Sequence, residues 1–102
     1  KLNEIKPDKM PIGYHYGVDK KFTKHEIELE KNDLIYLFSD GYIDQFGGPY
    51  NKKFNRRNFK NLLLSIEKHD MKEQYRILDN TIEEWKADTT QLDDMLIIGI
   101  RI

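Results

Sequence analysis

Cysteine is absent from the sequence, which excludes disulfide frameworks, thiol nucleophiles and cysteine-ligated zinc or iron–sulfur sites. No apolar run approaches the roughly 18 residues that a membrane-spanning helix needs, so we expect no direct membrane contact from this segment. Neither sign of charge is in surplus, because 17 Lys+Arg oppose 18 Asp+Glu and leave a formal net charge of -1. Nucleic-acid-binding domains carry a basic surplus that attracts phosphate, so we expect no nucleic-acid partner.

What the sequence does contain is a globular composition in a short chain. Its 102 residues fit one small domain, and 38% hydrophobic residues with 12% aromatics can form a modest core. The chain opens at Lys1 within charged residues, with neither an initiator methionine nor an apolar leader. We therefore expect residues 1–102 to be part of a longer protein.

Three segments have the patterns of β-strands. Residues 25–30 alternate apolar and charged side chains, which is typical of a strand with one face in water. Residues 34–38 and 95–100 are continuously apolar, as in inner strands whose two faces are both covered. Because residues 31–33 form a turn signal, we expect residues 25–30 and 34–38 to pair as a β-hairpin.

Two amphipathic helices are predicted in the second half of the chain. Asn55 can cap a helix over residues 56–68, and Asp70, with Glu73 three residues later, can begin a second helix. The apolar residues of each helix recur every three or four positions and define one buried stripe. The stripes are Phe59, Leu62, Leu63 and Ile66 in the first helix, and Met71, Tyr75, Leu78, Ile82 and Trp85 in the second.

The order of these elements predicts the fold class. Residues 41–55 are expected to be irregular, because Gly47, Gly48 and Pro49 favour a loop. The remaining elements run strand, strand, helix, helix, strand. This order is typical of an α+β fold, and we expect an antiparallel sheet covered by the two helices.

The residues that could bind a metal or take part in catalysis are carboxylates at the ends of two predicted strands. Asp40 follows the second strand, and Asp93 and Asp94 precede the last one. If these strands lie antiparallel and adjacent, Asp40 and Asp93 meet at the same edge of the sheet. Gly41 permits a sharp turn there, and Asp44 can add a carboxylate. Converging carboxylates usually bind a metal or share a proton, and oxygen ligands without cysteine or paired histidine favour Mg²⁺ or Mn²⁺.

A purely structural interpretation of these carboxylates stays open. Asp-Gly after a strand is a common turn, and an aspartate before a strand often caps a loop. Ser39 has no partnered histidine that would make it a nucleophile. The histidines share no ligand spacing; they are His15, His25, expected on a strand face, and His69, expected in the turn between the helices. A basic cluster either binds phosphate or is a solvated loop; it contains Lys52, Lys53, Arg56 and Arg57.

Three of these segments together resemble one protein family. Residues 38–48 read FSDGYIDQFGG and resemble the SDG-x-x-D segment of metal-dependent serine/threonine phosphatases of type 2C. Residues 93–98 read DDMLII and resemble that family's last motif, in which Asp-Asp or Asp-Asn leads into the final strand. Residues 10–13 read MPIG and resemble its P-[LI]-G segment. The most similar branch is the bacterial SpoIIE-like group, whose domains terminate large sensor proteins, so the resemblance implies signal transduction and a cytoplasmic location.

The resemblance implies a role for each of four carboxylates. Asp40 matches the metal-ligating aspartate of the SDG motif, and Asp93 matches the metal-ligating first aspartate of the last motif. Asp44 matches a position that helps to hold a third metal in some members, and Asp94 matches a supporting position. In the family, two Mn²⁺ or Mg²⁺ ions activate a bridging water that attacks phosphoserine or phosphothreonine. No catalytic residue beyond the metal ligands and no other cofactor is implied.

The resemblance covers roughly the C-terminal half of such a domain. The family's complete fold has two antiparallel sheets packed face to face with helices outside, and its earlier motifs have no match in residues 1–102. We expect this chain to lack turnover by itself and to self-associate through an uncovered apolar sheet face. The implied substrate of the whole protein is a phosphorylated regulatory protein. The alternative is a non-catalytic interaction module that uses the sheet as a docking surface.

Overall fold

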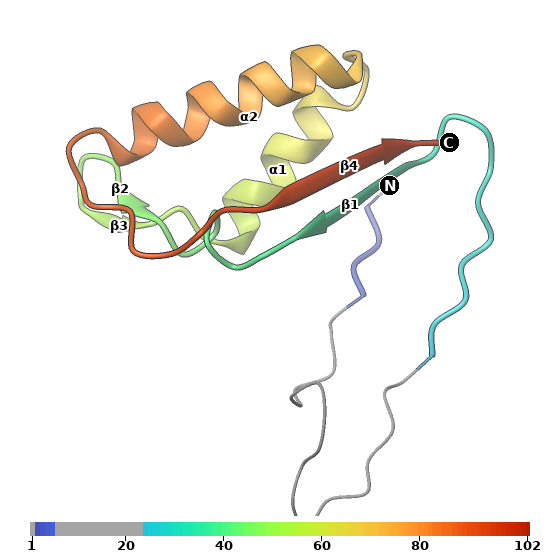
Figure 1. Ribbon diagram of the computed structural model, residues 1–102, viewed down its shortest axis with the longest axis horizontal. Helices are drawn as coiled ribbons and strands as arrows, with labels where there is room; N and C mark the ends of the chain where they lie inside the picture. The colour runs from blue at the N-terminus through green and yellow to red at the C-terminus, as the bar shows by residue number, and fades with distance from the viewer. Residues whose placement is uncertain (1, 6–23) are drawn as a thin grey trace, which may run out of the picture.

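The computed structural model describes residues 2–5 and 24–102, so the segment 10–13 and His15 lie outside the described residues. Two helices lie on one side of a pair of long strands, and a small hairpin lies at one end (Figure 1). In chain order the elements are β1 (Leu34–Phe38), β2 (Phe46–Gly47), β3 (Lys52–Lys53), α1 (Arg56–Ile66), α2 (Met71–Lys86) and β4 (Ile97–Arg101). The α+β fold with an antiparallel strand pair under two helices is confirmed.

The strand β1 pairs with β4 and not with the segment that precedes it. The pairing is antiparallel, with Leu34 opposite Arg101 and Phe38 opposite Ile97. The prediction of a strand at residues 25–30, and of a hairpin with β1, is wrong: residues 24–30 are exposed and have no strand structure. Alternation of apolar and charged residues fits the two faces of a strand, but a strand also needs a neighbouring strand with which to form hydrogen bonds. Here the neighbour of β1 comes from the far end of the described chain.

Both helices begin where the capping residues predict. The side chain of Asn55 accepts a hydrogen bond from the backbone N–H of Asn58, and Asp70 accepts one from that of Glu73, each at 2.8 Å. These bonds satisfy backbone donors that have no partner within a first helical turn. The first helix ends at Ile66, two residues earlier than expected.

One position of the predicted stripe on α2 is wrong. Tyr75 is 73% exposed, and its neighbour Gln74 is buried instead, at 1% exposure. The buried amide is tolerated because its polar atoms are paired: Gln74 accepts a hydrogen bond from the Tyr36 hydroxyl and donates one to the His69 carbonyl at 2.9 Å. The same interactions connect α2 to β1 and to the turn between the helices.

The segment expected to be irregular contains a small hairpin. Strands β2 and β3 pair antiparallel, with Phe46 opposite Lys53, and Gly48 turns the chain with a positive φ of 72°. The expected basic loop is therefore divided between β3, which carries Lys52 and Lys53, and the first turn of α1. On α1, Arg56 forms an ion pair with Glu4 at 3.2 Å. This acid compensates a basic side chain that is unfavourable at a helix N-terminus.

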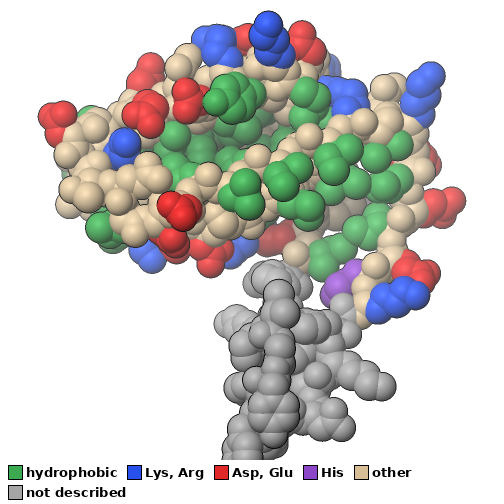
Figure 2. Space-filling model, viewed as in Figure 1, with side chains coloured by type: hydrophobic (Ala, Val, Ile, Leu, Met, Phe, Trp, Pro, Cys, Tyr) green, Lys and Arg blue, Asp and Glu red, His purple; other side chains and the backbone are tan. Residues whose placement is uncertain are grey.

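The core lies between the helices and the inner face of the strand pair. Its buried apolar members are Tyr42, Ile43, Phe54, Phe59, Leu63, Ile66, Leu78 and Ile82. The opposite face of β1–β4 is apolar and exposed (Figure 2): Leu37 and Ile98 are cross-strand partners, at 57% and 44% exposure. Neither described helix combines the length and the apolar character that would let it cross a membrane.

Candidate metal centre

The two acidic motifs lie at the same end of the strand pair, as the sequence predicts. The chain leaves β1 after Phe38 and enters β4 at Ile97, and these two residues are opposite each other in the antiparallel register. One residue further on, the backbone N–H of Ser39 donates to the Leu96 carbonyl at 2.9 Å. Asp40 and Asp93 therefore belong to two adjacent segments, the turn after β1 and the loop before β4.

Ser39 joins these two segments with its side chain. Its hydroxyl donates to the Asp94 carbonyl at 3.1 Å and accepts from the Leu96 backbone N–H at 3.0 Å. The hydroxyl therefore uses both its donor and an acceptor position in hydrogen bonds to the backbone, so Ser39 has a structural role beside the carboxylates. A nucleophilic role finds no support in this arrangement.

Gly41 lets the backbones of the two segments approach closely. A Cβ atom at Gly41 would lie 2.0 Å from the Asp94 carbonyl oxygen, far inside van der Waals contact. Gly41 does lie in a turn, as expected, but its φ is not positive, so conformational freedom is not what requires glycine. The requirement is space for the neighbouring backbone.

Gln45 also joins the segment after β1 to the loop before β4. Nothing in the sequence signals this role. It is 4% exposed, and its side-chain N–H group donates to the carbonyls of Phe46 at 3.0 Å and Thr90 at 3.2 Å. Its own backbone carbonyl accepts from the Trp85 indole N–H at 3.0 Å. A lone polar residue after an SDG-x-x-D motif gives no periodic signal, so only the fold reveals that it holds the loop leading to Asp93.

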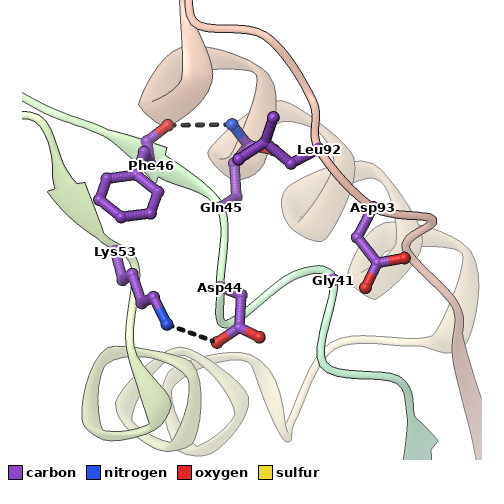
Figure 3. Close-up of a pocket in the computed structure, with 7 residues that line it drawn as sticks. All are labelled: Gly41, Asp44, Gln45, Phe46, Lys53, Leu92 and Asp93. Atoms are coloured by element: carbon purple, nitrogen blue, oxygen red, sulfur yellow. Dashed lines mark hydrogen bonds and ion pairs between the residues drawn. The ribbon is translucent and has the colours of Figure 1, made fainter.

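Asp44 and Asp93 line one concavity of about 310 Å³ (Figure 3). Asp44 comes from the turn after β1 and Asp93 from the loop before β4, with Gly41 between them in the lining. Lys53, from β3, places its Nζ 3.6 Å from Oδ1 of Asp44. The Asp93 carboxylate accepts a hydrogen bond from the Asp94 backbone N–H at 2.8 Å. Asp40 is exposed at the same sheet end but is not among the lining residues.

The type of ligand in this site fits a hard divalent cation, but the number of ligands is too small to complete its coordination shell. Asp40, Asp44 and Asp93 offer carboxylate oxygens, which Mg²⁺ and Mn²⁺ prefer. Within residues 2–5 and 24–102, however, no group of three or more His, Asp or Glu side chains is arranged to hold a metal. One or two carboxylates can still hold Mg²⁺ when water completes the shell. This part of the chain therefore offers some ligands of a metal centre.

The described histidines stay outside this site. His25 is exposed in a segment without regular structure, so its expected place on a strand face is wrong. His69 lies in the turn between α1 and α2, as expected, and its carbonyl accepts from Gln74 and from Arg101. Neither histidine lines the concavity.

The fold of the described residues is that of part of a PP2C-type domain. Among solved structures, the chain is similar to the SiaA-PP2C domain of Pseudomonas aeruginosa, with a TM-score of 0.77 and 28% sequence identity. The alignment covers 82% of this chain and 34% of that one, so the chain spans about a third of that structure's length. The sequence profile of the family Stage II sporulation protein E (SpoIIE) matches residues 1–102, and the chain belongs to this family. No curated protein sequence gives a significant match.

Membership confirms the resemblance that the motifs indicated. SpoIIE and PP2C-type domains are phosphatases, which hydrolyse phosphate esters. The structural match supports the mixed architecture of two helices and antiparallel strands. The metal roles of Asp40, Asp44 and Asp93 stay predictions.

Proposed function

We propose that the chain is the C-terminal part of a Mn²⁺- or Mg²⁺-dependent protein serine/threonine phosphatase domain. The observation that supports the proposal is the joining of two acidic segments at one sheet end by Ser39 and Gln45. Each of these bonds crosses from the turn after β1 to the loop before β4, so the two segments that carry the carboxylates are held side by side. Fixed geometry is what a metal centre requires of its ligands.

In this proposal Asp40 and Asp93 contribute ligands to the metal ions, and Asp44 is an additional ligand. When bound, the ions would supply an activated water and would neutralise charge on the phosphoryl oxygens. Residues of this chain fix where that happens: Ser39 aligns the two acidic segments, and Gln45 holds the loop that carries Asp93. Further ligands would come from the part of the domain that the chain does not span.

The proposed substrate is a phosphoserine or phosphothreonine on a regulatory protein. Asp44 and Asp93 are exposed at the surface, so a phosphorylated side chain on another folded protein could reach them. A deep, closed pocket would instead favour a small phosphate ester. The class of substrate rests on family resemblance, and the exposure of these carboxylates in this chain is in keeping with it.

The test is hydrolysis of p-nitrophenyl phosphate and of a phosphoserine peptide by the longer protein in which this chain completes the domain. Asp40→Asn and Asp93→Asn each remove a ligand charge while keeping side-chain size, so each should lower Mn²⁺-dependent turnover by about a hundredfold or more. Asp79→Asn on α2, away from the concavity, is the matched control and should keep most activity. Near-normal turnover by Asp40→Asn would show that the assignment is wrong.

A second candidate, a non-catalytic interaction module, is favoured by the exposed apolar face of β1–β4. Leu37, Ile98 and Ile100 could dock a partner there. The same experiment separates the two functions, because a docking module would show no metal-dependent hydrolysis in the complete domain, whereas its partner binding would survive Asp93→Asn.

A further inference from the structure

Lys53 is the cationic side chain among the residues that line the acidic concavity. Its Nζ lies 3.6 Å from Oδ1 of Asp44, and the side chains of both residues are about half exposed. Figure 3 shows the ammonium directed toward this carboxylate. A cation of the chain itself therefore lies beside the carboxylate of Asp44.

The backbone of Lys53 is fixed relative to Asp44. On β3, Lys53 is opposite Phe46, and the next residue, Phe54, donates its backbone N–H to the Gln45 carbonyl at 2.9 Å. The hairpin is also fastened to α2, because the backbone N–H of Gly48 donates to the Trp85 carbonyl at 2.9 Å. Lys53 thus extends from a strand that is tied to the segment carrying Asp44, and only its side chain is free to move away.

We propose that Lys53 is a built-in counter-cation of Asp44, which competes with a divalent cation for this carboxylate. The inference rests on the proposed metal role of Asp44. A metal ion at Asp44 would lie within a few Å of the ammonium, and like charges at such a distance repel. Binding of the metal ion must therefore displace the ammonium or proceed against its repulsion. In either case the affinity for the metal is lower. Lys53 would lower the fraction of Asp44 sites that are occupied by metal at a given metal concentration.

Lys52 provides a matched control on the same strand. Neighbouring residues of a strand point to opposite faces, and the Lys52 ammonium lies 6.0 Å from the centre of the Tyr50 ring instead of in the concavity. Replacing either lysine by glutamine removes one positive charge from β3. A change in metal affinity that arises only from net charge would then be equal in the two variants.

The experiment is a titration of the chain with Mn²⁺ and no other ligand. Binding is measured by water-proton relaxation and by broadening of amide resonances. Lys53→Gln should tighten Mn²⁺ binding by about two- to fivefold, the range expected for an exposed ion pair. Lys52→Gln should change the affinity less. In an Asp44→Asn background, Lys53→Gln should have no effect, because the carboxylate for which the two cations compete is then absent.

Each outcome decides the inference separately from the proposed function. An affinity of Lys53→Gln equal to that of the unchanged chain, or weaker, would overturn the counter-cation role and leave the phosphatase proposal intact. Absence of Mn²⁺ binding in every variant would contradict both the role and the metal centre. Tighter binding by Lys53→Gln, together with a complete domain that hydrolyses no phosphate ester, would support Lys53 and refute the proposed function.

Discussion

At the scale of single residues, Tyr42 shows how one side chain of the SDG motif serves the core. It follows Gly41, is buried, and packs between Phe54 and Phe59, with ring centroids 5.3 and 5.2 Å away. Its hydroxyl donates to the Leu78 carbonyl on α2 at 2.7 Å. The acidic turn is thereby anchored to a helix by the residue two positions after Asp40.

This burial predicts a pH dependence of stability. Burial, and secondarily the charge of Asp79, raises the pKa of Tyr42 above its usual value. The folded chain then holds a proton that the unfolded chain releases near about pH 10, so the stability contribution is complete below that pH and is lost as pH rises above it. Tyr42→Phe should cost about 1 kcal/mol at neutral pH, because one hydrogen bond is lost.

The variant should also have a flatter decline of stability in alkali, measured by urea unfolding between about pH 8 and 11. Tyr36, whose pKa burial also raises, remains as an internal control and keeps part of the slope. An unchanged alkaline slope in Tyr42→Phe would contradict the assignment of this dependence to Tyr42.

At the scale of elements, the sequence predicted what depends on local patterns. Capping side chains and apolar periodicity placed both helices, because the bonds of Asn55 and Asp70 join residues only three positions apart. The apolar runs placed β1 and β4, although only one face of this strand pair is covered within the described residues. The position of Asp40 and Asp93 at the same end of the strand pair followed from antiparallel pairing, whereas their joint metal role stays a prediction.

What the sequence could not predict depends on contacts between distant segments. The alternating residues 25–30 are not a strand, because β1 pairs with β4, which lies some sixty positions further along the chain. Gln74 replaces Tyr75 in the core because Tyr36 on β1 supplies a hydrogen-bond partner. Gln45 is buried for a similar reason, through Thr90. Such satisfied polar groups have no periodic signature.

At the scale of the whole molecule, the uncovered face of the strand pair is the dominant feature. Cross-strand neighbours Leu37 and Ile98 are exposed side by side, and Ile100 continues the patch. Large apolar patches on soluble proteins usually mark an interface. Within the described residues, no element covers this face.

We therefore expect the isolated chain to self-associate through this face. Sedimentation velocity at rising protein concentration should show a dimer or larger species, and Leu37→Lys together with Ile98→Lys should return the chain to a monomer. The paired control Leu64→Lys alters an exposed apolar residue on α1, outside the patch, and should leave association unchanged. A monodisperse monomer at high concentration, without binding of a hydrophobic dye, would count against the prediction.

We propose that the acidic end of β1–β4 is part of a metal centre, and a Mn²⁺ titration of the chain followed by NMR is the test of this role. With few protein ligands, Mn²⁺ should bind at about millimolar strength or weaker and cause no turnover of a phosphate ester. Broadening should be confined to amides around Asp40, Asp44 and Asp93. Broadening centred instead on the shallow concavity along α2 that Asp70 and Asp79 line, or no broadening at tens of millimolar Mn²⁺, would contradict a metal centre at the end of β1–β4.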